Sequence, residues 1–153
     1  MVKKYKRPDD PLTSFRFVVK ESKTDKDLAG FSNISGLEIT IETEKFQEGG
    51  SNEVYSLPKG VGYSNLVLKK GLASTELWDW YKKTLDAVVY GKPIPYKDLT
   101  VIIYESDFQT YKWKLEFLNA FPVKWSGSEL NAKDNNIIIE TIEIAHRGMI
   151  KHG

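Results

Sequence analysis

The chain has 153 residues, which fits one domain with a hydrophobic core large enough to fold without staples. Its 22 Lys and Arg residues face 21 Asp and Glu residues, and the resulting net charge of +1 does not point to nucleic acid or to an anionic membrane. The absence of cysteine excludes disulfides, thiolate metal sites and a cysteine nucleophile.

The chain shows no apolar segment that could insert into a membrane. The longest apolar runs are Ala87–Tyr90 and Val101–Tyr104, far below the roughly 20 residues of a membrane-spanning helix. The charged N-terminus is not followed by an apolar stretch, so we expect no secretory signal and folding in a cytosol.

Residues 1–13 are expected to form a polar N-terminal arm with little to bury. Four basic residues here would suit an arm that binds nucleic acid. They are soon followed by Asp9 and Asp10, which favours a solvated or partner-docking terminus instead.

Alternation of apolar and polar residues predicts strands from Phe15 onward. The clearest is 37–46, in which Leu37, Ile39 and Ile41 should face one way and Glu38, Thr40 and Glu42 the other. Further strands are predicted over 15–20, 28–34, 63–70, 99–105, 110–117 and 136–146.

Residues 47–62 hold four of the eleven glycines and are expected to form a long loop or irregular hairpin. A connection of this length inside a compact domain is more often functional than incidental.

One convincing helix is predicted over 75–90, with Ser74 as N-cap and Gly91 followed by Pro93 as the stop. Its apolar positions cover an arc of about 200°, which is wider than a helix on a single core requires. Trp78 and Trp80 lie at opposite margins of this arc, so we expect the helix to contact something besides its own sheet. Six or seven strands and one helix favour a mainly β fold, an antiparallel barrel or sandwich with the helix outside.

The sequence predicts no catalytic, cofactor or metal site. His146 and His152 lack a third metal ligand nearby, and the acidic stripe of Glu38, Glu42 and Glu44 is better explained as the solvated face of a strand. A small barrel that binds a ligand or an oligonucleotide stays open as an alternative of a different class.

Seven segments, in order from about residue 10 to 148, resemble the tube proteins of contractile phage tails. Each alone is a weak match, but together they cover most of the chain. They are Asp10–Phe17, Ala29–Glu38, Glu48–Gly50 followed by Leu57–Gly60, Asn65–Leu72, Glu76–Trp80, Asn119–Gly127 and Glu140–His146.

The resemblance implies a six-stranded antiparallel β-barrel with one flanking helix, formed by residues 14–148 and followed by a C-terminal tail, residues 149–153. Members of this family also build the inner tubes of extracellular contractile injection systems, and they share the fold of the Hcp tube protein of type VI secretion. Six copies form a ring, and rings stack into a hollow tube inside a contractile sheath.

The expected protein is therefore a structural subunit, not an enzyme, and it needs no cofactor. Its implied partners are further copies of itself, the sheath protein, baseplate and spike proteins, and a tape-measure protein, effector cargo or phage DNA in the lumen. It would be assembled in the cytoplasm without inserting into a membrane itself. It would become part of a phage tail or of an injection-system particle.

The resemblance and the residue patterns together suggest three groups of assembly residues. Ring stacking is assigned to Phe46, Glu48, Gly49, Gly50, Asn52, Tyr55, Leu57 and Pro58, subunit contact to Trp78, Trp80 and Val89, and the lumen wall to Glu38, Thr40, Glu42, Lys112, Lys114 and Glu116.

The chain departs from the family pattern in the N-terminal arm, in 91–97 and in the C-terminal tail. These departures leave open a tube-initiating or adaptor ring between the tube and the spike or baseplate.

Overall fold

A computed structural model describes residues 15–28, 31–71, 75–105, 109–133 and 138–153, so the N-terminal arm and Ser74 lie outside the described residues. The fold is mainly β with one helix, as predicted. The elements are β1 (Phe15–Glu21), β2 (Lys26–Asp27), β3 (Asn33–Ser35), β4 (Ile39–Gln47), β5 (Val54–Tyr63), β6 (Leu66–Gly71), α1 (Glu76–Tyr90), β7 (Lys97–Glu105), β8 (Tyr111–Gly127), β9 (Ile139–Ala145) and β10 (Gly148–His152).

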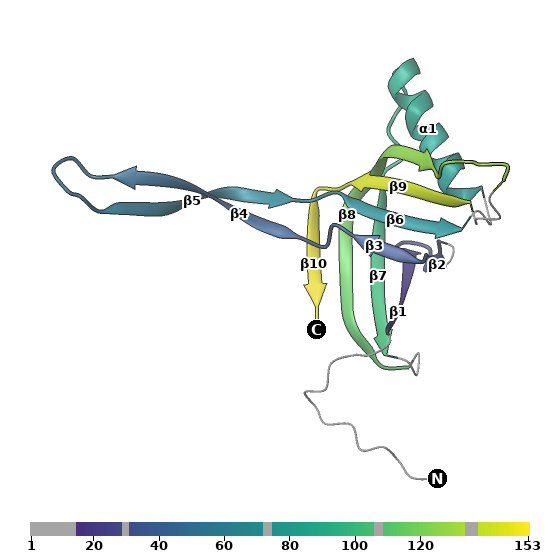
Figure 1. Cartoon of the computed structure of the whole chain (residues 1–153), viewed down its shortest axis with the longest axis horizontal. Coiled ribbons are helices and arrows are strands. Elements are labelled where there is room, and N and C mark those ends of the chain that lie inside the picture. Colours follow the sequence, from purple (N-terminus) through teal and green to yellow (C-terminus); the bar gives the residue numbers. More distant parts are fainter. Residues whose placement is uncertain (1–14, 29–30, 72–74, 106–108, 134–137) are drawn as a thin grey trace, which may run out of the picture.

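The described strands of the body form one antiparallel sheet that folds over at β8. The hydrogen-bonded order is β2-β1-β7-β8-β9-β6-β3, and β10 also pairs with β8. The first part of β8 pairs with β7 and β10, and its last part pairs with β9, so β8 belongs to both halves of the sheet. Figure 1 shows β7 and β8 running at a steep angle to β6 and β9.

The core lies between the two halves of the folded sheet, where alternate residues of each strand point inward. Leu66 and Leu68, which alternate along β6, are both fully buried, and Val101 is buried opposite Leu115. The buried apolar cluster consists of Val19, Leu28, Leu66, Leu68, Leu77, Trp80, Leu99, Val101, Leu115, Phe117, Ala120, Ile142 and Ile144.

Helix α1 packs on the body through residues spaced three or four apart, namely Leu77, Trp80, Thr84 and Ala87. The backbone N–H of Lys92 donates to the Ala87 carbonyl at 2.9 Å. Gly91 takes a left-handed conformation (φ 67°), which ends the helix where the sequence predicts.

Strand β8 continues well beyond the predicted end at Phe117. Asn119 has a positive φ of 48°, an irregularity that the Asp98 carboxylate stabilises by accepting the Asn119 backbone N–H at 2.8 Å. The strand therefore bends and crosses into the other half of the sheet. The segment expected as a C-terminal tail also differs from the prediction: it forms β10, in which Met149 lies opposite Phe117 and packs against the core.

Strands β4 and β5 form a separate two-stranded hairpin, residues 39–63, that projects from the body (Figure 1). Of the long loop or irregular hairpin expected over 47–62, the structure shows the irregular hairpin: most of the segment is β5, and only the short turn between Gln47 and Val54 is without strand structure. Ile39 and Ile41 are exposed, because no second layer from the described part of the chain covers them.

Candidate assembly surfaces

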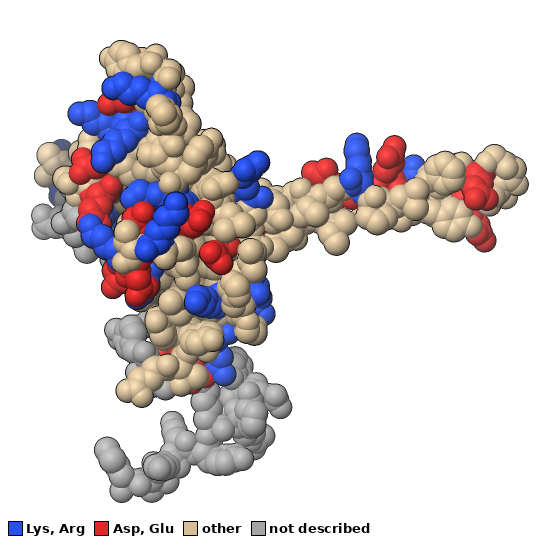
Figure 2. Space-filling model, turned by 180° about the vertical axis from the view of Figure 1, so that it is seen from behind, with Lys and Arg blue, Asp and Glu red and all other residues tan. Residues whose placement is uncertain are grey.

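The hairpin exposes more large apolar side chains than its own two strands can cover. Ile41 is 65% exposed although β-branched residues of this kind are usually buried. Figure 2 shows that uncharged residues make up most of the visible hairpin surface. The exposed apolar residues of the hairpin are Ile39, Ile41, Phe46, Val54, Tyr55, Leu57, Val61 and Tyr63.

The predicted ring-stacking residues fall into two places on this hairpin. Phe46 and Tyr55 are directly opposite each other, and Leu57 lies opposite Glu44 on the same face. Pro58 lies opposite Thr43 in the ladder. The remaining residues, Glu48, Gly49, Gly50 and Asn52, form the turn at the tip.

Hydrogen bonds within the hairpin order the tip turn in the single chain, without a second subunit. The Ser51 N–H donates to the Glu48 carbonyl at 3.1 Å, and the Gln47 side-chain amide donates to the Ser51 carbonyl at 2.9 Å. Gly50 has a φ of 87°, which favours glycine. The Tyr55 hydroxyl donates to Glu53 at 2.7 Å, and this hydrogen bond raises the pKa of Tyr55 above its ordinary value.

The root of the hairpin is fixed tightly to the body. Gly36 has a φ of 84°, and a Cβ at this position would lie 1.9 Å from the Asn65 carbonyl oxygen. The Asn65 amide donates to Glu143 at 2.9 Å, and the His146 ring contacts the Ser64 carbonyl at 2.9 Å. These contacts set the direction in which the hairpin leaves the sheet.

Helix α1 presents a second apolar surface, on the side away from the core. Trp78 is 39% exposed and packs edge-on against Trp125 at a centroid distance of 4.8 Å, while Val89 is 63% exposed. Leu85 and Val88 are also exposed. Part of the wide apolar arc predicted from the sequence is therefore uncovered in the single chain, and its contact with another surface stays a prediction.

Trp80 does not belong to that surface. It is only 4% exposed, and its indole N–H donates to the Pro95 carbonyl at 2.9 Å inside the subunit. The structure therefore places Trp80 in the subunit's own core, because its position on the helix repeats with Leu77, Thr84 and Ala87.

The predicted lumen residues lie on two different parts of the fold. Lys114 and Glu116 alternate with the buried Leu115 and Phe117 on β8, so they lie on the face of the sheet opposite the core. Lys112 forms an ion pair with Glu105 at 2.8 Å, and Glu116 lies 3.3 Å from His152. The second group, Glu38, Thr40 and Glu42, lies along the base of the hairpin, where Thr40 donates to Glu38 at 3.3 Å.

A buried ion pair that the sequence pattern does not reveal links β6 to β9. Lys70 and Glu140 are each 1% exposed, and their charged atoms lie 3.9 Å apart. The Trp125 indole N–H also donates to Glu140 at 2.5 Å. Trp125 in turn contacts Trp78 of α1, so the helix packs close to the buried Lys70–Glu140 ion pair.

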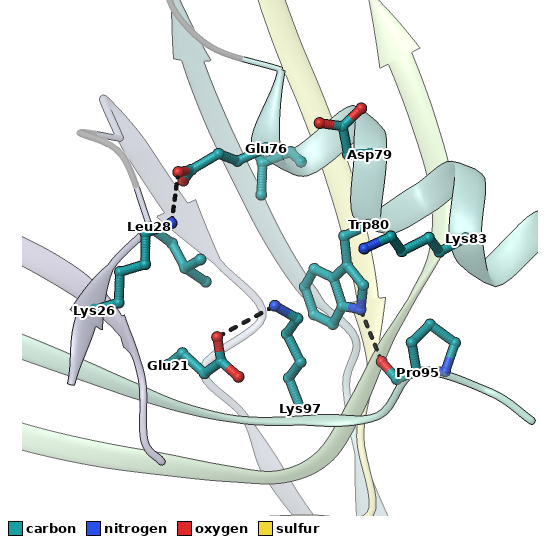
Figure 3. Close-up of a pocket in the computed structure, with 10 residues that line it drawn as sticks. Glu21, Lys26, Leu28, Glu76, Asp79, Trp80, Lys83, Pro95 and Lys97 are labelled. Carbon is teal, nitrogen blue, oxygen red and sulfur yellow. Dashed lines mark hydrogen bonds and ion pairs between the residues drawn. The ribbon is translucent and has the colours of Figure 1, made fainter. Parts of the chain in front are cut away.

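A pocket of about 250 Å³ lies beside the first half of α1 (Figure 3). Leu28, Leu77, Trp80 and Pro95 provide its apolar lining. Its rim charges largely neutralise one another: Lys26 pairs with Glu76 at 3.1 Å, and Lys97 pairs with Glu21 at 3.2 Å. Asp79 and Lys83 complete the charged lining, which thus holds three acidic and three basic side chains.

Within the described ranges, no group of three or more His, Cys, Asp or Glu side chains could hold a metal ion. In that same part of the chain, no helix has both the length and the apolar character required to cross a membrane.

Comparisons with solved structures match this architecture. A chain of the cryo-EM structure of the anti-feeding prophage baseplate is 26% identical, with 94% of this chain and 97% of that chain covered and a TM-score of 0.73. A chain of the PVC extracellular contractile injection system sheath–tube complex is 23% identical, with 95% and 93% covered and a TM-score of 0.77. Hcp1 from Flavobacterium johnsoniae is 19% identical, with 90% and 95% covered and a TM-score of 0.59.

The sequence comparison points the same way. No curated protein matches the chain significantly. The family described as T4-like virus tail tube protein gp19 matches residues 13–150, which is most of the sequence. The chain therefore belongs to the gp19 tail tube protein family.

Proposed function

We propose that this protein is a structural subunit of the inner tube of a contractile injection system or phage tail. Copies associate into sixfold rings, and the rings stack into a hollow tube with a lumen for effector cargo, a tape-measure protein or DNA. The chain itself performs no chemical step in this proposal.

The projecting hairpin is the observation that carries the proposal. Its apolar side chains remain in water in the single chain, and a two-stranded hairpin is marginally stable by itself. Contiguous exposed apolar residues of this kind mark protein–protein contacts. Assembly into rings and tubes covers them and also pairs the exposed edges of the hairpin and of the sheet.

Three contacts belong to this proposal. The hairpin tip reaches the next ring, the outer face of α1 around Val89 contacts a neighbouring subunit or the sheath, and the β8 face with Lys114 and Glu116 lines the lumen. Baseplate and spike proteins bind the first ring. The particle is assembled in the cytoplasm.

A tube-initiating ring is the second candidate. The similarity to a chain of a sixfold-symmetrised baseplate favours it, since the first ring of a tube stands on the baseplate. Both candidates require self-association through the hairpin.

Light scattering of the purified chain over a concentration series tests the proposal. A mass of six chains, or multiples of it, is the expected result. A chain that remains monomeric at all concentrations, and also in the presence of its sheath and baseplate proteins, would contradict it.

A further inference from the structure

We propose that the cross-strand register set by a one-residue bulge in β5 aligns two apolar patches of the hairpin into one continuous stripe, and that this stripe docks on a second copy of the chain. The inference rests on the proposed function and deepens it. It names the docking surface and the structural feature that sets its orientation.

The apolar residues of the hairpin form two patches on opposite faces of the ribbon. Near the root, Ile39 lies opposite Tyr63 and Ile41 lies opposite Val61, and these four residues are the base patch. Near the tip, Phe46 lies opposite Tyr55, with Leu57 beside them, and these three are the tip patch. Odd-numbered residues of β4 belong to the first face and even-numbered residues to the second.

The bulge creates the tip patch. Glu42 pairs with Gly60 and Thr43 pairs with Pro58, so Lys59 is an extra residue in β5. If the ladder continued without the bulge, so that Thr43 paired with Lys59, alternation would put Leu57 and Tyr55 on the face of Val61 and Tyr63, away from Phe46. With it, the two aromatic rings are cross-strand partners.

The twist of the ribbon then brings both patches to one side. In Figure 1, β5 lies above β4 near the body and below it near the tip, so the ribbon turns over along its length. Two-stranded ribbons twist strongly. The two patches lie on opposite faces of the ribbon, and the ribbon turns over between them. The base patch and the tip patch therefore lie on the same side of the hairpin.

A second copy of this chain fits the stripe. The hairpin carries four Glu and two Lys, a net charge of −2, whereas the rest of the chain carries 20 basic and 17 acidic residues, a net charge of +3. This complementarity favours contact between the hairpin of one copy and the body of another. Phe and Tyr at the tip are residue types enriched in the centres of protein interfaces.

Two variants that both remove the bulge test the inference. A threonine inserted between Glu42 and Thr43 gives Lys59 a partner and moves the tip patch to the other ribbon face. Deletion of Lys59 preserves every remaining cross-strand pair and therefore the relation between the patches. In light scattering, we expect the insertion to abolish assembly and the deletion to preserve it.

Two substitutions provide a second, independent comparison. Leu57→Thr weakens the tip patch, whereas Val54→Thr changes an equally exposed apolar residue on the opposite ribbon face, where it pairs with Gln47. We expect Leu57→Thr to raise the assembly concentration about tenfold or more, and Val54→Thr to change it less than about twofold. Far-UV circular dichroism confirms that each variant is folded.

The outcomes separate this inference from the proposed function. If the unmodified chain assembles and the insertion variant does so equally well, the stripe is wrong and the tube proposal stands. Equal effects of insertion and deletion, or of Leu57→Thr and Val54→Thr, also overturn the stripe. If the unmodified chain does not associate at all, both proposals fall.

Discussion

Gly36→Ala is expected to be among the most damaging single-methyl additions in this chain. Gly36 lies at the root of the hairpin with a φ of 84°, where an alanine is strained by about 1–2 kcal/mol. Its new Cβ would also lie 1.9 Å from the Asn65 carbonyl oxygen, a backbone atom that cannot rotate away. Relieving such an overlap costs about 1–3 kcal/mol.

The two costs together predict a loss of about 2–5 kcal/mol in the free energy of unfolding. For a chain of this size, that corresponds to a decrease in Tm of roughly 5–15 °C. Thermal unfolding followed by far-UV circular dichroism, below the assembly concentration, measures it.

Gly50→Ala is the matched control. Gly50 also has a positive φ, 87°, but no atom lies within 4 Å of the position of its Cβ. It therefore carries the conformational cost alone, about 1–2 kcal/mol at most, and its tip turn can open locally without unfolding the body. Equal decreases in Tm for the two variants would refute the argument that close approach at Asn65 fixes the hairpin root.

Three further predictions concern the helix, the buried ion pair and the tip. Trp80→Ala should lower the free energy of unfolding, measured with urea, by about 3–5 kcal/mol, and Trp78→Ala should lower it clearly less, because only Trp80 is fully packed. The reverse order would contradict the assignment of Trp80 to the core. Lys70→Met should lower the free energy of unfolding by about 3–5 kcal/mol, because it leaves the Glu140 charge buried without its cation. The double variant Lys70→Met/Glu140→Met should be more stable than Lys70→Met, and a less stable double variant would argue against this pairing. Gly50→Val should impair ring stacking more than Gly49→Val, since only Gly50 has a positive φ, and electron microscopy showing equal tube lengths would contradict a role for the tip turn.

The helix and strands of the body are predicted well from the sequence where their apolar faces are covered by other parts of the same chain. The helix was predicted almost to the residue because its apolar spacing and Gly91 act locally. The strand predicted over 63–70 overlaps β6, whose Leu66 and Leu68 are buried by other parts of the same chain. Strand β8 was underestimated because Asn119 and Pro122 resemble strand breakers, and the Asp98 carboxylate that accommodates Asn119 comes from a distant part of the chain.

The hairpin could not be predicted as a projecting element. Ile39 and Ile41 alternate with polar residues like any half-buried strand, and alternation does not tell which chain covers the apolar side. The sequence around Pro58, Gly60 and Gly62 is typical of a loop. These residues are nevertheless tolerated here, because both strands of a two-stranded ribbon are edge strands. The residues assigned to ring stacking lie on this hairpin, and their role stays a prediction; the projection of the hairpin from the body required the structure.

The central claim is that this chain builds a hollow tube by self-association through its hairpin. Negative-stain electron microscopy of the purified chain beside its Leu57→Thr variant tests it most directly. The account predicts sixfold rings or hollow tubes for the unmodified chain, and few or none for the variant at the same concentration. Identical tubes from both, or separate monomers from both that persist when the sheath and baseplate proteins are added, would contradict it.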